Sequence, residues 1–200
     1  EVDDNRDEVK ATLHIDYPKH VTWVNETKQR YKIPDAKATK SFAYNPRFIR
    51  RQVDVILEES VPVFVSALGP PDWMAKDAHA QGMKIIGMVG NIRHAQRHVE
   101  AGADIIVAQG TEAGGHTGKI STMVLVPQIV DAVSPIPVVA AGGIGDGRGI
   151  AAALSLGATG VWCGTLFLAS IEASVPNIHK QRIVDGRSED WIITRLNSGK

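Results

Sequence analysis

Downstream of residue 46, the chain alternates short apolar runs with segments in which apolar residues recur every three or four positions. The short runs are typical of strands that are buried on both faces, and the periodic segments are typical of amphipathic helices. The pattern predicts strands over 61–67, 84–89, 104–109, 136–141 and 160–167. It predicts helices over 46–59, 71–81, 91–101, 121–133 and 146–156, of which the third is capped by Asn91 and the last starts at Asp146.

The strict alternation of these strands and helices requires a parallel sheet whose crossover connections are helical. Two folds meet that requirement, a TIM (β/α)8 barrel and an open doubly wound sheet. Glycine-rich clusters follow several successive strands late in the chain, which favours the barrel, because its loops share one site at the carboxyl ends of the strands. A doubly wound dinucleotide fold would carry its main fingerprint at the first turn. We therefore expect an incomplete TIM barrel, since the clear strands are too few to close it.

Residues 1–45 differ from the rest of the chain, because their apolar positions are scattered and follow no period. They are predicted to form an irregular polar segment, in which a short strand or two and a helix are open alternatives, and residues 46–200 to form the barrel portion. The first barrel strands are either poorly marked within 1–45 or absent. The chain starts without Met and stops without an obvious end, so we expect a fragment that is truncated at both ends.

Charge and cysteine content exclude several classes of protein. The 22 basic and 22 acidic residues cancel and form no basic stripe, so we expect no nucleic-acid partner. No apolar run reaches the roughly 18 residues of a membrane span, so we expect no membrane partner. The single cysteine, Cys163, rules out an intrachain disulfide and fits a reducing compartment, which favours a cytoplasmic location.

The densest glycine cluster follows the predicted strand 104–109. Its glycines stand within nine residues, at Gly110, Gly114, Gly115 and Gly118. Such a composition is costly unless the backbone must closely approach another group. His116 lies inside this cluster and is either a solvated loop residue or a functional one. In the second case, a neutral imidazole facing a bound flat ring could take a proton from a substrate carbon or donate a hydrogen bond to an oxygen.

Other titratable groups have weaker claims. Glu112 could orient His116, orient the loop or cap a local turn. His94 and His98 have the spacing of a helical metal pair, but neighbouring arginines would repel a cation, so we interpret them as part of a solvated helix face and expect no metal site. A catalytic Lys84 or Asp104 is disfavoured, because these residues stand at the amino ends of their strands.

A second glycine cluster follows the predicted strand 136–141. Gly142 and Gly143 would expose backbone N–H groups, and the helix that starts at Asp146 would add the partial positive charge of its N-terminus. This combination binds phosphate. Gly164 and Thr165, at the next strand end, would complete the site in the loops where barrels commonly bind phosphate. The alternative is a tight turn without a ligand.

The segments 108–118, 125–133, 140–149 and 164–169 resemble, in order and spacing, those of the nitronate monooxygenase family, formerly called 2-nitropropane dioxygenases. The resemblance covers roughly residues 46–200, and residues 1–45 match nothing in the family. Two family features near the flavin do not occur in this chain, a Gln-Ala-Pro-Met-like segment and a Gly-Gly-rich strand end. Family members also continue past the segment equivalent to 194–200.

The resemblance implies an FMN-binding TIM barrel that uses oxygen to convert alkyl nitronates, or nitroalkanes, to a carbonyl compound and nitrite. It makes His116 the catalytic base or the partner of the nitro group. The residues implied along the flavin ring and ribityl chain are Gln109, Ala113, Gly114 and Gly115. The residues implied around the phosphate are Ala141, Gly142, Gly143, Gly164 and Thr165. A homodimer is one open assembly.

Other functions stay open at this point. The same flavin barrel serves FMN-dependent enoyl-acyl-carrier-protein reductases and NAD(P)H:quinone reductases, whose relatives carry a similar Gly-Gly-His loop. A phosphate-binding barrel without flavin, of isomerase, aldolase or synthase type, is less favoured, because it usually needs a catalyst borne on a strand. A protein without catalytic activity is the last alternative.

Overall fold

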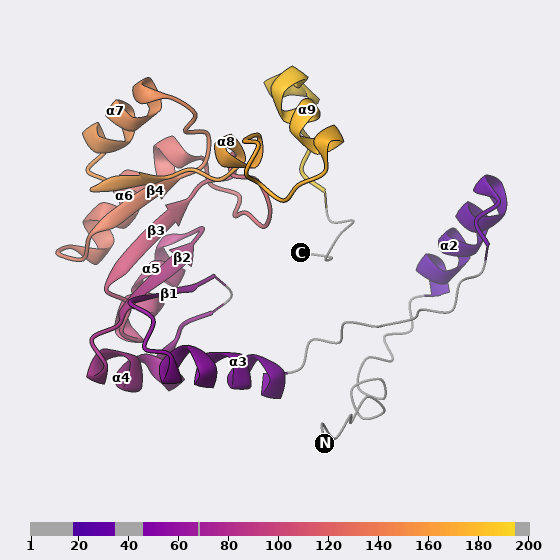
Figure 1. Ribbon diagram of the computed structural model, residues 1–200. Coiled ribbons are helices and arrows are strands. Elements are labelled where there is room, and N and C mark those ends of the chain that lie inside the picture. The colour runs from indigo at the N-terminus through magenta and orange to yellow at the C-terminus, as the bar shows by residue number, and fades with distance from the viewer. Residues whose placement is uncertain (1–17, 35–45, 68, 195–200) are drawn as a thin grey trace. The chain divides into compact units, whose positions relative to one another are not determined.

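The computed structural model describes residues 18–34, 46–67 and 69–194 (Figure 1). The chain divides into two compact units, residues 1–56 and 57–200. In the first unit, helix α2 spans Pro18–Tyr31, and helix α3 spans Pro46–Glu58 and crosses the boundary. Within residues 1–45, a helix was one of the alternatives left open, and α2 is such a helix. Much of α2 is exposed, including Trp23 and Tyr31, so its sequence needs no strong apolar period.

The second unit is built on a parallel five-stranded sheet. Its strands are β1 (Val63–Ser66), β2 (Lys84–Val89), β3 (Ile105–Gln109), β4 (Val138–Ala141) and β5 (Gly160–Trp162). The helices that connect them are α4 (Asp72–Ala80), α5 (Ile92–Glu100), α6 (Thr122–Val133) and α7 (Gly147–Ser155). Each lies within a few residues of its predicted range.

The order of the strands in the sheet distinguishes the two candidate folds. Each strand pairs with the next one in sequence, from β1 through β5, without a reversal (Figure 1). A doubly wound sheet reverses its strand order at the point where its ligand binds, whereas a barrel adds each strand on the same side. The sheet is therefore arranged like a sector of a barrel.

The two faces of the sheet differ in burial. Ile85, Ile106 and Val138 lie on the face that packs against the helices, and each is 2% exposed or less. On the opposite face, Val63 is 49% exposed and Trp162 is 39% exposed. The expectation that both faces are buried is thus wrong at the edge strands β1 and β5, whereas Val107 and Ala141 in the middle of the second face are buried. An apolar inner face is typical of barrel strands, whose side chains are covered only when further strands close the ring.

The last predicted strand is too long. Strand β5 ends at Trp162, and helix α8 (Thr165–Leu168) begins after Gly164. The apolar and β-branched residues of 160–167 look like one strand, but Gly164 has an αR backbone conformation that turns the chain. Helix α9 (Asn177–Asp185) and the 3-10 turn η1 (Ser188–Asp190) follow, and neither was predicted.

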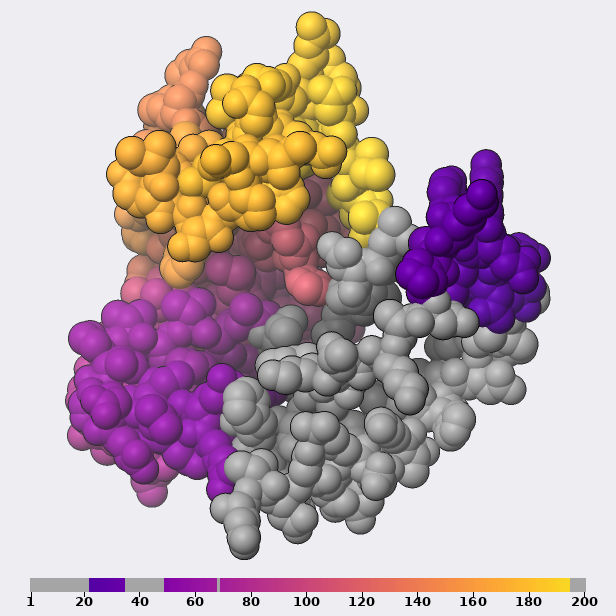
Figure 2. All heavy atoms as spheres, turned by 45° about the vertical axis from the view of Figure 1, so that its right-hand side comes forward, coloured from indigo at the N-terminus to yellow at the C-terminus, as the bar shows by residue number. Residues whose placement is uncertain are grey.

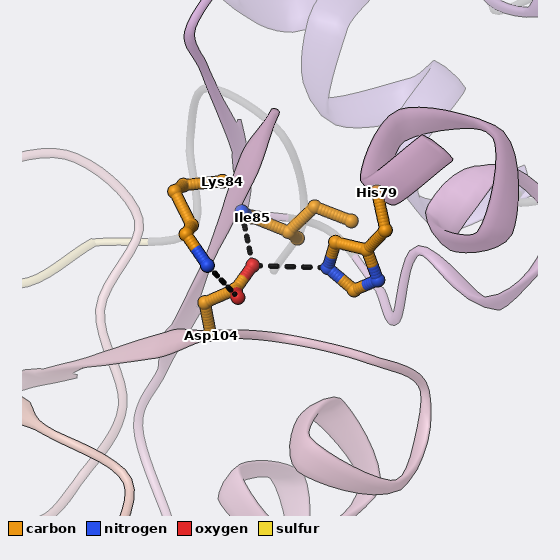
Figure 3. Close-up of polar contacts among 4 residues, drawn as sticks. All are labelled: His79, Lys84, Ile85 and Asp104. Atoms are coloured by element: carbon orange, nitrogen blue, oxygen red, sulfur yellow. Dashed lines mark hydrogen bonds and ion pairs between the residues drawn. The ribbon is translucent and has the colours of Figure 1, made fainter. Parts of the chain in front are cut away.

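A carboxylate joins the amino ends of β2 and β3 to helix α4 (Figure 3). Asp104 accepts hydrogen bonds from Lys84 Nζ at 2.9 Å, from the backbone N–H of Ile85 at 2.8 Å and from His79 Nε2 at 3.0 Å. Burial by itself would raise the pKa of Asp104, but these bonds outweigh it and hold the pKa below its usual value. The prediction that Lys84 and Asp104 lie away from the carboxyl ends of the strands is confirmed, and their role is to connect the elements.

Candidate functional site

The loops that follow β3, β4 and β5 meet at the carboxyl end of the sheet. The backbone N–H of Gly110 donates to the carbonyl of Ala141 at 2.9 Å, which ties the first loop to the second. Gly114 lies against Thr165, because a Cβ atom on Gly114 would stand 3.2 Å from the Thr165 hydroxyl. Cys163 Sγ lies 3.4 Å from the carbonyl of Ile144 and ties the third loop to the second. The structure thus brings together the three strand ends that the sequence singled out.

The glycines at this junction fall into two groups. Gly142 has φ of 107° and Gly143 has φ of 68°, conformations that favour glycine. A Cβ atom on Gly142 would lie 2.9 Å from Thr122 Oγ1 and 3.1 Å from the backbone nitrogen of Ala113, so this glycine allows the first two loops to touch. Gly115 and Gly164, in contrast, have open space where a Cβ atom would stand. A ligand can therefore approach the backbone at these two positions.

The N-terminus of α7 is already occupied by a side chain. Asp146 accepts hydrogen bonds from the backbone N–H groups of Arg148 at 2.9 Å and Gly149 at 3.4 Å. It also pairs with the Arg148 guanidinium, and these bonds hold the pKa of Asp146 below its usual value. The predicted N-cap is confirmed. The carboxylate uses two of the N–H groups of this helix end, so the phosphate site expected here would depend on the glycine turn before the helix.

Two backbone N–H groups at this junction donate no hydrogen bond among the described residues. They belong to Gly143, in the turn before α7, and to Thr165, at the start of α8. Gly142, Gly143, Gly164 and Thr165 therefore remain the groups at this junction that suit an anionic ligand.

His116 lies in the loop after β3 and is exposed, as are Gly114 and Gly115 before it. Figure 2 shows this loop, in rose, reaching the surface of the second unit. Gln109, at the end of β3, is half-buried, and Ala113 is half-buried within the loop. His116 is thus accessible to a small molecule at the same strand end as the glycines.

Glu112 is exposed in the same loop, and its carboxylate has hydrogen-bond partners at the start of α6. Its two carboxylate oxygens accept from the backbone N–H of Thr122 at 3.1 and 2.9 Å, and Oε2 lies 2.9 Å from Thr122 Oγ1. The geometry supports a capping role for Glu112, although its carboxylate caps α6 and not a local turn. Thr122 was missed as a site residue. Its signal in the sequence was a hydroxyl at a helix start, four residues after the last glycine of the loop.

The two histidines of α5 have different environments. His94 is exposed, and its backbone N–H donates to the Asn91 side chain at 2.9 Å, which confirms the predicted N-cap. His98 is only 4% exposed, and its Nδ1 has no hydrogen-bond partner among the described residues. The prediction of a solvated face is wrong for His98, because Gly87 of β2 leaves room for its ring. Burial, then His94 and Arg97, lower the pKa of His98.

Groups of His, Cys, Asp and Glu that could hold a metal ion do not occur in the parts of the chain that the structure describes. In the same parts, no helix is both long and apolar enough to cross a bilayer.

Solved structures with similar coordinates identify the fold. FabK from Thermotoga maritima superposes with a TM-score of 0.72 and 40% sequence identity, over 76% of this chain and 49% of that chain. A nitroalkane oxidase from Streptomyces ansochromogenes superposes with a TM-score of 0.64 and 36% identity, over 66% of this chain and 42% of that chain. Both are TIM barrels. The sheet is therefore part of a (β/α)8 barrel, and the predicted fold class is confirmed.

Sequence comparison identifies the family. Residues 9–200 match the model of the nitronate monooxygenase family. Rv1533 of Mycobacterium tuberculosis, whose name describes a monooxygenase, is 45% identical over 188 residues, which are 90% of this chain and 50% of that protein. The chain belongs to the nitronate monooxygenase family and spans about half the length of this relative. The family match begins well before residue 46, where the resemblance was expected to start.

Proposed function

We propose that this chain supplies the carboxyl-end loops of an FMN site, and that the protein oxidises alkyl nitronates with oxygen to a carbonyl compound and nitrite. The observation that carries the proposal is the meeting of the loops after β3, β4 and β5, with open space beside Gly115 and Gly164. Membership in the nitronate monooxygenase family supports the same reaction.

The FMN phosphate would be held by Ala141, Gly142, Gly143, Gly164 and Thr165. The flavin ring and ribityl chain would lie along Gln109, Ala113, Gly114 and Gly115. Backbone N–H groups suit a phosphate, because they stabilise negative charge without a lysine. When bound, FMN supplies the electron-transfer chemistry, while the protein binds and orients the reacting groups.

His116 is the proposed catalytic residue. As a neutral imidazole it would take a proton from the carbon that carries the nitro group of a nitroalkane. With an already anionic nitronate, it would instead donate a hydrogen bond to a nitro oxygen. The exposure of His116 in the loop fits either role, because a substrate can reach the ring from solvent.

The test begins with the absorbance spectrum of the purified protein after incubation with FMN, followed by a nitrite assay with an alkyl nitronate in air. Bound flavin and released nitrite are the expected results. With a neutral nitroalkane as the substrate, a His116→Ala variant should keep FMN and lose nitrite release by about 100-fold, the size of a general acid–base contribution. His94→Ala is the matched control, since His94 lies on α5 and is also exposed. A protein that cannot bind FMN would overturn the proposal and leave a phosphate-binding barrel or a protein without catalysis.

A second function is favoured by the similarity to FabK, an enoyl-acyl-carrier-protein reductase. In that case the same flavin site would serve a reductase of enoyl thioesters or of quinones. Bound flavin without nitrite release, together with NAD(P)H consumption on an enoyl thioester or a quinone, would establish this alternative.

We also propose a cytoplasmic protein that acts on small molecules, on the basis of its single cysteine and balanced charge. A homodimer is one assembly that light scattering would detect.

A further inference from the structure

One side-chain contact within the site, between Glu112 and Thr122, is not accounted for by FMN binding or by His116. Helix α6 begins at Thr122, and the side chain of its N-cap residue, Ser121, makes no capping hydrogen bond. The cap comes from Glu112 in the preceding loop, whose carboxylate accepts from the Thr122 backbone N–H. A carboxylate at this position also interacts favourably with the helix dipole, and α6 has no acidic residue in its own first turn.

The same pair reaches the turn after β4. Thr122 Oγ1 lies 2.9 Å from Glu112 Oε2 and 3.1 Å from the carbonyl of Gly142. A hydroxyl has one hydrogen, so Thr122 donates to the carboxylate or to the carbonyl while remaining in contact with both. Glu112 and Thr122 thus connect the loop that carries His116, the start of α6 and the turn at Gly142.

The surrounding glycines are shaped around this pair. A Cβ atom on Gly110 would lie 2.0 Å from Thr122 Oγ1 and 2.7 Å from Glu112 Oε2. A Cβ atom on Gly143 would lie 3.3 Å from the Cβ of Glu112. The backbone on both sides therefore leaves space for the side chains of Glu112 and Thr122. A Cβ atom on Gly110 or Gly143 would crowd them.

We propose that Glu112, acting through Thr122, is a positioning residue that sets the His116 loop against the phosphate-binding turn at Gly142 and Gly143. The catalytic part of this inference rests on the proposed function. Because Glu112 stands four residues before His116 in the same loop, losing its carboxylate would free the loop at its base. The turn at Gly142 would keep its contact with Thr122 but would lose its connection through Glu112 to the loop.

Hydrogen exchange tests the mechanical part of the proposal without any cofactor. In Glu112→Ala, backbone exchange should rise about tenfold at the bonded amides of Thr111 and Ala113 in the loop, relative to the original protein. It should rise equally at Gly110, whose N–H donates to Ala141 beside the turn. Glu112→Gln keeps one carbonyl oxygen as an acceptor and should restore much of the protection. Glu100→Ala, an exposed glutamate at the end of α5, is the matched control and should change none of these amides. Faster exchange confined to the first turn of α6 would overturn the proposal, because Glu112 would then be a helix cap alone.

Binding and kinetics test the catalytic part. We expect Glu112→Ala to raise the dissociation constant of FMN about tenfold and, at saturating FMN, to lower kcat with little change in KM. Thr122→Ser should behave like the original protein, and Thr122→Val should resemble Glu112→Ala. Unchanged FMN affinity and kcat in a variant with a lower Tm would overturn the proposal. If the original protein binds no FMN, the proposed function fails, and the exchange experiment still decides the positioning role.

Discussion

The packing of Gly87 against His98 gives the sharpest prediction for the fold. Gly87 lies in β2, directly beneath the buried imidazole of α5. In Gly87→Ala, the new methyl group would lie 2.4 Å from Nδ1 of His98, 2.8 Å from Cγ and 2.9 Å from Cβ. Ordinary contacts begin near 3.4 Å, so the overlap with Nδ1 is about 1 Å. The ring cannot escape to solvent without uncovering β2, because only 4% of His98 is exposed.

The expected cost follows from this overlap. Forcing one extra methyl group into a packed core typically costs about 1–3 kcal/mol, and a clash with a rigid ring belongs at the upper end, about 3 kcal/mol. For a domain of this size, that loss lowers Tm by about 6–12 °C. His98→Ala removes the ring and should cost about 1–2 kcal/mol alone. In the double variant the methyl group has space, so its stability should be close to that of His98→Ala.

Urea unfolding of the four proteins in this cycle measures the coupling directly. Gly145→Ala is the control, because a Cβ atom there meets nothing within 4 Å, and its free energy of unfolding should change by less than about 0.5 kcal/mol. Strictly additive losses in the double variant would refute the reasoning, since they would mean that the methyl group and the ring do not compete for the same space.

Three further predictions concern stability. Asp104→Asn should lower the free energy of unfolding by about 2 kcal/mol, because three hydrogen bonds to a carboxylate are weakened. The pKa of Asp104 is depressed in the folded protein, so the carboxylate stabilises the fold above the usual carboxyl pKa, and this stabilisation is lost as the pH falls below it. In an acid titration, the stability of Asp104→Asn should not show this loss. The pKa of His98 is also depressed, so the unfolded imidazole takes up the proton more readily and stability should fall as pH drops below about 6.5; His98→Leu should abolish this slope in urea titrations at several pH values. Asn91→Ala removes the cap of α5 and should cost about 1 kcal/mol by thermal unfolding, whereas an unchanged Tm would contradict the capping role.

Local sequence patterns were sufficient for much of the fold. Strand β2 occupies the predicted range 84–89, and α5 and α7 begin after Asn91 and Asp146, where caps were expected. These features depend on neighbouring residues, because a cap or an apolar run acts within one element. The pattern failed at 160–167, where a turn at Gly164 interrupts residues that all suit a strand. It left α2 as one of several alternatives, because the largely exposed surface of this helix imposes little periodicity.

The sequence by itself determined which strand ends carry glycines, that His116 lies among them, and that the elements alternate as in a barrel. Only the three-dimensional arrangement placed His98 over Gly87 and the Glu112 carboxylate at the start of α6. Each of these depends on which distant backbone a side chain meets. A periodicity describes which residues share a face of one element, but the partner of that face is set by how the strands and loops come together in space.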